Sequence, residues 1–211
     1  DSEVKLYLSI LATTGLITYI TLYVSTEINE NMLADSIFQA VSIGTTTGYL
    51  TSNYANWPLF VPIMLLSAAF IGACAGSTGG GIKVIRALVL MRQGVGEITK
   101  LIHPNAVVTI KFGKKSLDPR VSESVWGFFS IYVAIFVVLL MFMLSQSNDF
   151  LTSFSAVGAT LNNLGPGLGE VSSNYKDLND ASKLGLCLAM LLGRLEIFTL
   201  LLVFTPAFWR S

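Results

Sequence analysis

The residues of this chain best suited to chemistry lie in two short strings of glycine, threonine and asparagine. They are Gly44-Thr45-Thr46-Thr47-Gly48-Tyr49 and Asn162-Asn163-Leu164-Gly165-Pro166-Gly167. Such strings offer backbone carbonyls as cation ligands, because glycine allows the unusual φ and ψ values that turn carbonyls inward. No Ser-His-Asp set or carboxylate pair points to an enzyme site, and two cysteines with one histidine cannot complete a usual zinc site. We therefore expect cation coordination and no enzymatic activity.

The segments before the two strings predict how they are positioned. Residues 31–43 and 148–159 are apolar but too short to span a bilayer, which favours re-entrant helices. Asn or Asp stands near each start, as suits a helix N-cap. An irregular loop at membrane depth must line a watery path or lie buried in protein.

The first string resembles the Thr-Val-Gly-Tyr-Gly filter of potassium channels, whose carbonyls replace the ion's hydration shell. Residues 44–49 and 162–167 are thus interpreted as filter loops, although each could be a plain turn between helices. The expected potassium ligands are Thr45, Thr46, Thr47, Gly48, Asn162, Asn163, Leu164 and Gly165.

The composition indicates an all-α integral membrane protein. Hydrophobic residues make up 53% of the 211 residues and charged residues 12%, against roughly 25% charged in soluble domains. Mean hydropathy is +0.66. Long apolar runs predict spans over residues 6–24, 121–144 and 184–204, with a broken span over 58–98.

The order of span, short helix, glycine string and span occurs twice. Residues 1–98 hold the first copy, 99–120 a basic connection, and 121–211 the second copy. Ser52-Asn53-Tyr54 is echoed by Ser173-Asn174-Tyr175, which supports an internal repeat.

Charge predicts the orientation in the membrane. Eight of the 13 Lys and Arg residues lie between Lys83 and Arg120, opposed there only by Glu97 and Asp118. By the positive-inside rule this segment is cytoplasmic. The other connections are acidic, so both strings are expected to open toward the outside and beneath negative charge.

Residues 76–83, Gly-Ser-Thr-Gly-Gly-Gly-Ile-Lys, superficially resemble a phosphate-binding loop. Ile82 separates the last glycine from Lys83, and no strand pattern precedes the segment. We expect a break in a membrane helix that forms a flexible loop under the pore, with tight helix packing through small residues as the alternative.

Arg194 stands ten residues into the last apolar run, with Glu196 two positions later. Ionisable residues this deep are functional candidates, and their positions place the two on nearly opposite helix faces. Arg194 is predicted to face the pore, although neighbouring helices could instead neutralise both residues.

These motifs resemble those of the Trk/Ktr/HKT family of potassium transporters. The resemblance covers nearly the whole chain and rests on the two strings, on 75–83, on Gly193-Arg194 and on the terminal Pro206-Ala207-Phe208-Trp209-Arg210. It implies four helix–pore loop–helix repeats around one pore, of which this chain holds the third and fourth. Gly48 and Gly165 take the filter-glycine places. The implied gate consists of Gly76, Ser77, Thr78, Gly79, Gly80, Gly81 and Arg194.

The resemblance also implies partners and a location. It implies a bacterial inner-membrane homodimer, completed by a missing N-terminal half with two further repeats. A cytosolic TrkA-like ring would dock on the basic segment and carry a nucleotide, while this chain binds no cofactor beyond potassium and no nucleic acid. Two alternatives remain: two such halves that assemble into an independent cation channel, and a membrane enzyme, for which no catalytic constellation is found.

Overall fold

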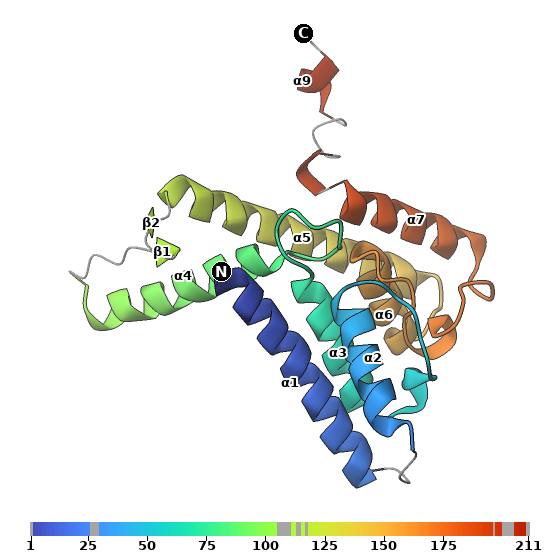
Figure 1. The fold of residues 1–211 in the computed structure, drawn as a ribbon. Helices are drawn as coiled ribbons and strands as arrows, with labels where there is room; N and C mark the ends of the chain where they lie inside the picture. The colour runs from blue at the N-terminus through green and yellow to red at the C-terminus, as the bar shows by residue number, and fades with distance from the viewer. Residues whose placement is uncertain are drawn as a thin grey trace.

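The computed structural model describes residues 2–25, 30–104, 111–112, 115–116, 118–195, 197–199 and 205–209. The described part is helical apart from one antiparallel pair of two-residue strands (Figure 1). The elements are α1 (Ser2–Ser25), α2 (Met32–Gly44), η1 (Tyr54–Asn56), α3 (Phe60–Ile71), α4 (Val84–Ile102), β1 (Lys111–Phe112), β2 (Lys115–Ser116), α5 (Pro119–Ser145), α6 (Phe150–Leu161), η2 (Gly169–Val171), α7 (Asp180–Arg194) and α9 (Pro206–Trp209). The all-α prediction is confirmed.

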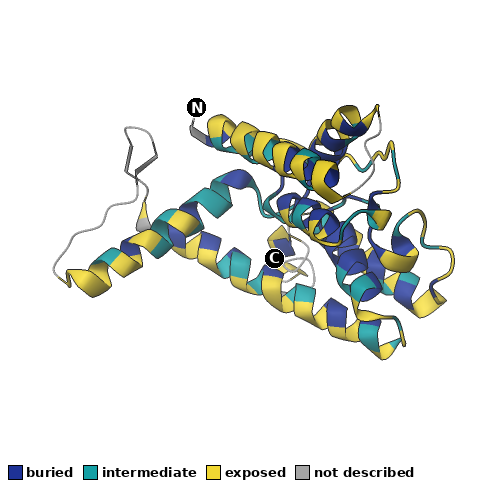
Figure 2. Ribbon diagram, turned by 90° about the horizontal axis from the view of Figure 1, so that it is seen from below, coloured by how far each residue is buried: buried dark blue, intermediate teal, exposed yellow. Residues whose placement is uncertain are grey.

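Two helices of the described residues are long and apolar enough to cross a bilayer, Glu3–Ser25 and Arg120–Ser145. Most of their side chains face outward, where Leu16 is 58% exposed and Val138 is 67% exposed. Figure 2 shows this exposure along both helices. A continuous apolar surface of this kind suits contact with lipid.

The two repeats pack side by side around one core. In the first, α1 lies along α2 and α3; in the second, α5 lies along α6 and α7. Helix α3 packs on α6 and joins the repeats. The largest core cluster accordingly combines both copies, with Ile43 and Leu65 from the first against Ala159 and Leu164 from the second. The two strings are thus fixed to one shared core.

The two pore helices start differently. Asp149 caps α6, because its Oδ2 accepts hydrogen bonds from the backbone N–H of Leu151 and of Thr152. Asn31 stands at the N-cap of α2 without a side-chain cap bond. Asp35 instead accepts a 2.8 Å hydrogen bond from the Thr51 hydroxyl. The predicted capping role is therefore confirmed for the second helix and wrong for the first.

The last predicted span, 184–204, is not one continuous helix. Helix α7 ends at Arg194, and Leu195 forms a turn. Gly193 lies so close to the carbonyl oxygen of Leu161 that an added Cβ would overlap it. A basic residue in the last turn also suits the negative end of the helix. Arg194 is therefore at a helix end, and the predicted continuous span is interrupted there; Glu196 lies outside the described residues.

The broken span 58–98 separates into α3 and α4, with residues 72–83 between them outside any helix. Only α3 is strongly apolar, and α4 does not meet the length-and-hydropathy criterion for a span. Helix α4 and the start of α5 extend away from the rest of the molecule (Figures 1 and 2). We call these two helical stretches, α4 and the start of α5, the projecting arm.

Candidate functional site

The two strings repeat one backbone pattern. The N–H groups of Thr45, Thr46 and Thr47 donate to the carbonyls of Val41, Ile43 and Ser42. Those of Asn162, Asn163 and Leu164 donate in the same way to Gly158, Thr160 and Ala159. The pattern makes Thr46 equivalent to Asn163, and Gly48 equivalent to Gly165.

The backbone angles agree with this equivalence. Thr46 has φ +56° and Asn163 φ +53°, while Gly48 has φ +82° and Gly165 φ +103°. Left-handed φ values are strained for residues with a Cβ and natural for glycine. The unusual backbone predicted at the two glycines is confirmed, and the strain at Thr46 and Asn163 identifies them as positions that the surrounding structure must hold.

The two strings contact each other. An added Cβ at Gly48 would overlap the carbonyl oxygen of Leu164 and approach Pro166 Cδ to 3.2 Å. The carbonyl of Leu164 therefore faces the backbone of the first string. Both strings follow the C-terminal ends of α2 and α6, whose dipoles favour a cation there. The hydroxyls of Thr45 and Thr47 lie 2.7 Å apart in the first string.

The glycine-rich loop lies directly against both strings. The backbone N–H of Gly80 donates a 3.0 Å hydrogen bond to Thr46 Oγ1. An added Cβ at Gly80 would overlap the carbonyl oxygen of Asn162. Since a helix precedes this loop, the strand–loop–helix of a phosphate-binding loop is absent from the described residues here.

Two charged side chains fix the shape of the loop. Lys83 Nζ donates to the carbonyls of Ser77, at 2.6 Å, and of Gly79, at 3.0 Å. At the loop's other stem, Glu3 Oε1 accepts a 2.6 Å hydrogen bond from the backbone N–H of Ala75. Glu3 is only 9% exposed. The first helix of the chain thus contacts the stem of the loop, a contact that could not be predicted from the sequence.

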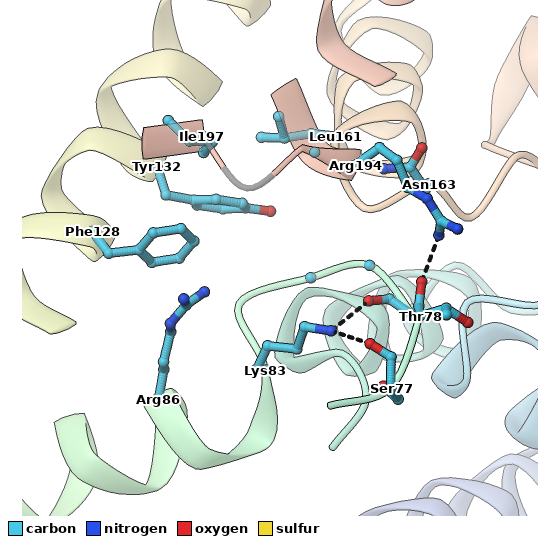
Figure 3. A pocket seen from close by; sticks show the side chains of 14 residues that line it. Ser77, Thr78, Lys83, Arg86, Phe128, Tyr132, Leu161, Asn163, Arg194 and Ile197 are labelled. Atoms are coloured by element: carbon cyan, nitrogen blue, oxygen red, sulfur yellow. Dashed lines mark hydrogen bonds between the residues drawn. The ribbon is translucent and has the colours of Figure 1, made fainter. Parts of the chain in front are cut away.

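Arg194 reaches the middle of this loop. Its Nη1 donates a 2.6 Å hydrogen bond to the carbonyl oxygen of Thr78. Figure 3 shows the guanidinium above the loop, with Phe128 and Tyr132 across the cavity and Arg86 below. Arg86 lies 4.1 Å from the centre of the Phe128 ring. The structure therefore places the loop and the arginine together, at a cavity of about 280 Å³ whose lining includes Asn163 and Gly193.

The C-terminal parts of the strings are held by side chains outside the predicted site. Ser42 Oγ donates to the carbonyl of Tyr49 at 2.6 Å. The Tyr54 hydroxyl donates to Gly167 at 2.8 Å, and the Tyr175 hydroxyl to Gly165 at 2.5 Å. Burial raises the pKa of Tyr54 and of Tyr175 above that of free tyrosine, which keeps both phenols protonated as donors. The repeated Ser-Asn-Tyr motif was the available signal, because it contains both tyrosines.

Comparison with known proteins decides the family. The sequence pattern of the family described as TrkH, cation transport protein, matches residues 8–211. The chain belongs to the TrkH family. The Trk system potassium uptake protein TrkH of Vibrio parahaemolyticus is 57% identical over 176 residues, which cover 83% of this chain and 36% of that protein. TrkH of Escherichia coli K12 is 46% identical over 213 residues, which cover 100% of this chain and 44% of that protein.

The fold agrees with this family. The crystal structure of the potassium transporter TrkH from Vibrio parahaemolyticus matches all of this chain with a TM-score of 0.92 and 50% identity. The match covers 45% of the solved chain, so this TrkH-family chain spans less than half the length of its relatives. Membership assigns it to membrane-embedded transport proteins and not to enzymes.

Proposed function

We propose that this chain forms two adjacent walls of a potassium-conducting pore, with residues 44–49 and 162–167 as selectivity-filter segments. The contact between Gly48 and the Leu164 carbonyl carries the proposal. It joins two backbones with the same irregular conformation, each at the C-terminal end of a short apolar helix. A backbone loop at this depth can lower the cost of dehydrating a cation only through its carbonyls.

Two walls cannot enclose an ion. The pore therefore requires two further repeats, which agrees with relatives more than twice as long as this chain. Those relatives are named as potassium uptake proteins, which supports potassium as the ion. We call this chain joined to two such repeats the complete transporter. It would lie in the bacterial inner membrane.

The loop at residues 76–81 and Arg194 form the gate in this proposal. The loop occupies the space just inside the strings, where Gly80 contacts both Thr46 and Asn162. A guanidinium keeps its charge in proteins, so Arg194 also opposes the passage of cations. Closure would then combine a steric block with electrostatic repulsion.

The projecting arm, from α4 to the start of α5, is the proposed dock for cytosolic partners. It contains the predicted basic segment, and a positive surface attracts anionic partners. A second copy of the transporter and a nucleotide-binding ring remain the expected partners.

Substitution of the first filter glycine tests the proposal. Gly48→Ala adds a Cβ that overlaps the Leu164 carbonyl at a left-handed φ, and each effect moves the strings. We expect the ratio of potassium to sodium flux into vesicles holding the complete transporter to fall by about tenfold or more. Gly94→Ala is the matched control, because nothing lies within 4 Å of its added Cβ in helix α4. An unchanged ratio in well-folded Gly48→Ala protein would contradict the filter assignment.

A further inference from the structure

The outer ends of the two strings are held by different donors, although their backbones are equivalent. In the first string, Ser42 Oγ donates to the carbonyl of Tyr49. The equivalent positions in the second string are Ala159 and Pro166. Alanine has no hydroxyl, so the second pore helix cannot supply the bond that Ser42 makes in the first.

Tyr54 supplies the missing donor from the other repeat. Its hydroxyl lies 3.3 Å from the carbonyl oxygen of Pro166 and 2.8 Å from that of Gly167. The side chain is 1% exposed, within the core cluster shared by the two repeats. A buried hydroxyl is costly unless it is bonded, and these carbonyls belong to a loop with no regular backbone ladder. The bond therefore gives a partner both to the buried Tyr54 hydroxyl and to the loop carbonyl that accepts from it.

Tyr175, the other tyrosine of the repeated motif, acts on the same loop. Its hydroxyl donates to the carbonyl of Gly165, the filter glycine itself. Two phenols therefore donate to this loop, Tyr175 to the carbonyl of Gly165 and Tyr54 to that of Gly167, with the Pro166 carbonyl as the weaker partner of Tyr54 at 3.3 Å. The carbonyl of Leu164, one residue earlier, faces Gly48 of the first string. The two phenols thus hold the loop directly after the carbonyl that faces the first string.

We propose that Tyr54 is a positioning residue that sets ion selectivity from across the repeat boundary, by holding the Pro166 and Gly167 carbonyls of the second string. The inference rests on the proposed filter. It assigns to the first repeat a direct part in shaping the filter segment of the second. Tyr54 acts through these carbonyls and does not itself touch the ion.

Removal of the hydroxyl alone tests this role. Tyr54→Phe keeps the ring in the core but leaves the two carbonyls without their donor, so we expect the potassium-to-sodium flux ratio of the complete transporter to fall about fivefold. Tyr23→Phe, which removes a hydroxyl from a side chain that is 56% exposed on α1, should leave the ratio unchanged. Transporter abundance and thermal stability are measured on each variant, so that flux is compared between folded proteins.

A second variant distinguishes positioning from packing. Ala159→Ser places a hydroxyl where the first repeat has Ser42, so Tyr54→Phe combined with Ala159→Ser should recover at least half of the lost ratio. Failure to recover would overturn action through the Pro166 carbonyl. Gly48→Ala is measured in parallel. If Gly48→Ala lowers the flux ratio and Tyr54→Phe does not, the role proposed for Tyr54 is contradicted while the filter assignment is retained. If neither substitution changes the flux ratio, the filter assignment itself is contradicted.

Discussion

The guanidinium of Arg194 donates a 2.6 Å hydrogen bond to the carbonyl oxygen of Thr78, in the middle of the glycine-rich loop. The bond joins the C-terminal end of α7 to the break between α3 and α4. The same loop contacts the first string through the bond from Gly80 to Thr46. The loop is therefore joined to the end of α7 by Arg194 and to the first string by Thr46.

Loss of the Arg194 contact should favour an open loop. A hydrogen bond with one charged partner contributes about 1.5–3 kcal/mol, and the exposure of Arg194 places it at the lower end. Arg194→Ala should therefore raise potassium flux roughly tenfold in vesicles containing the complete transporter.

Arg194→Lys separates the two contributions of this side chain. Lysine keeps the positive charge but lacks the planar guanidinium that reaches Thr78. If repulsion dominates, the lysine variant stays as slow as the parent; if the hydrogen bond dominates, it conducts nearly as fast as the alanine variant. Unchanged flux in Arg194→Ala protein of normal abundance would show that the arginine is structural.

The contact between Gly80 and Asn162 gives a second test of the gate. Gly80 has no left-handed φ, so an alanine there is opposed only by the overlap of its Cβ with the Asn162 carbonyl. Gly80→Ala should displace the loop from the strings and raise flux severalfold, as measured by isotope uptake. Gly76→Ala is the comparison, because its Cβ meets open space and its cost is limited to a φ of +82°. Lower flux in Gly80→Ala than in Gly76→Ala would argue that the loop supports the pore instead of blocking it.

The sequence predicted the elements of the fold better than their contacts. Helices α2 and α6 follow from short apolar runs that end in glycine, and Asp149 could be recognised as an N-cap from its position alone. The end of α7 at Arg194 could not be predicted, because the apolar run continues past it, and the close approach of Gly193 to the backbone of Leu161 is visible only in the structure. Hydropathy describes how apolar a segment is and contains no information on which backbone it will meet.

The glycines of the candidate site could be recognised from the sequence, but the side chains that hold the strings and the loop in place could not. Gly48 and Gly165 were recognisable because a left-handed backbone favours glycine. Glu3 was not, because it meets the N–H of Ala75 only through the packing of α1 near the loop. Tyr54 was visible as part of a repeated motif, but its bond to the second string crosses 113 residues of sequence. Long-range contacts of this kind are decided by the tertiary arrangement.

The predicted orientation can be measured with single cysteines. Leu101→Cys lies at the end of α4 at a position that is 83% exposed, and Glu170→Cys lies in the acidic connection after the second string. In a background without Cys74 and Cys187, an impermeant thiol reagent added to intact cells should label Glu170→Cys and spare Leu101→Cys. The reverse pattern would invert the orientation and place the arm outside the cell.

If the carbonyls of the two strings bind the conducted ion, anomalous X-ray diffraction should locate the ion beside them. Crystals of the complete transporter grown in rubidium, which replaces potassium and scatters anomalously, would be compared with crystals grown in sodium. We expect a rubidium peak beside the Leu164 carbonyl and the first string, and a weaker peak in Gly48→Ala. Rubidium density confined to other parts of the molecule, with these carbonyls bonded only to protein or water, would contradict it.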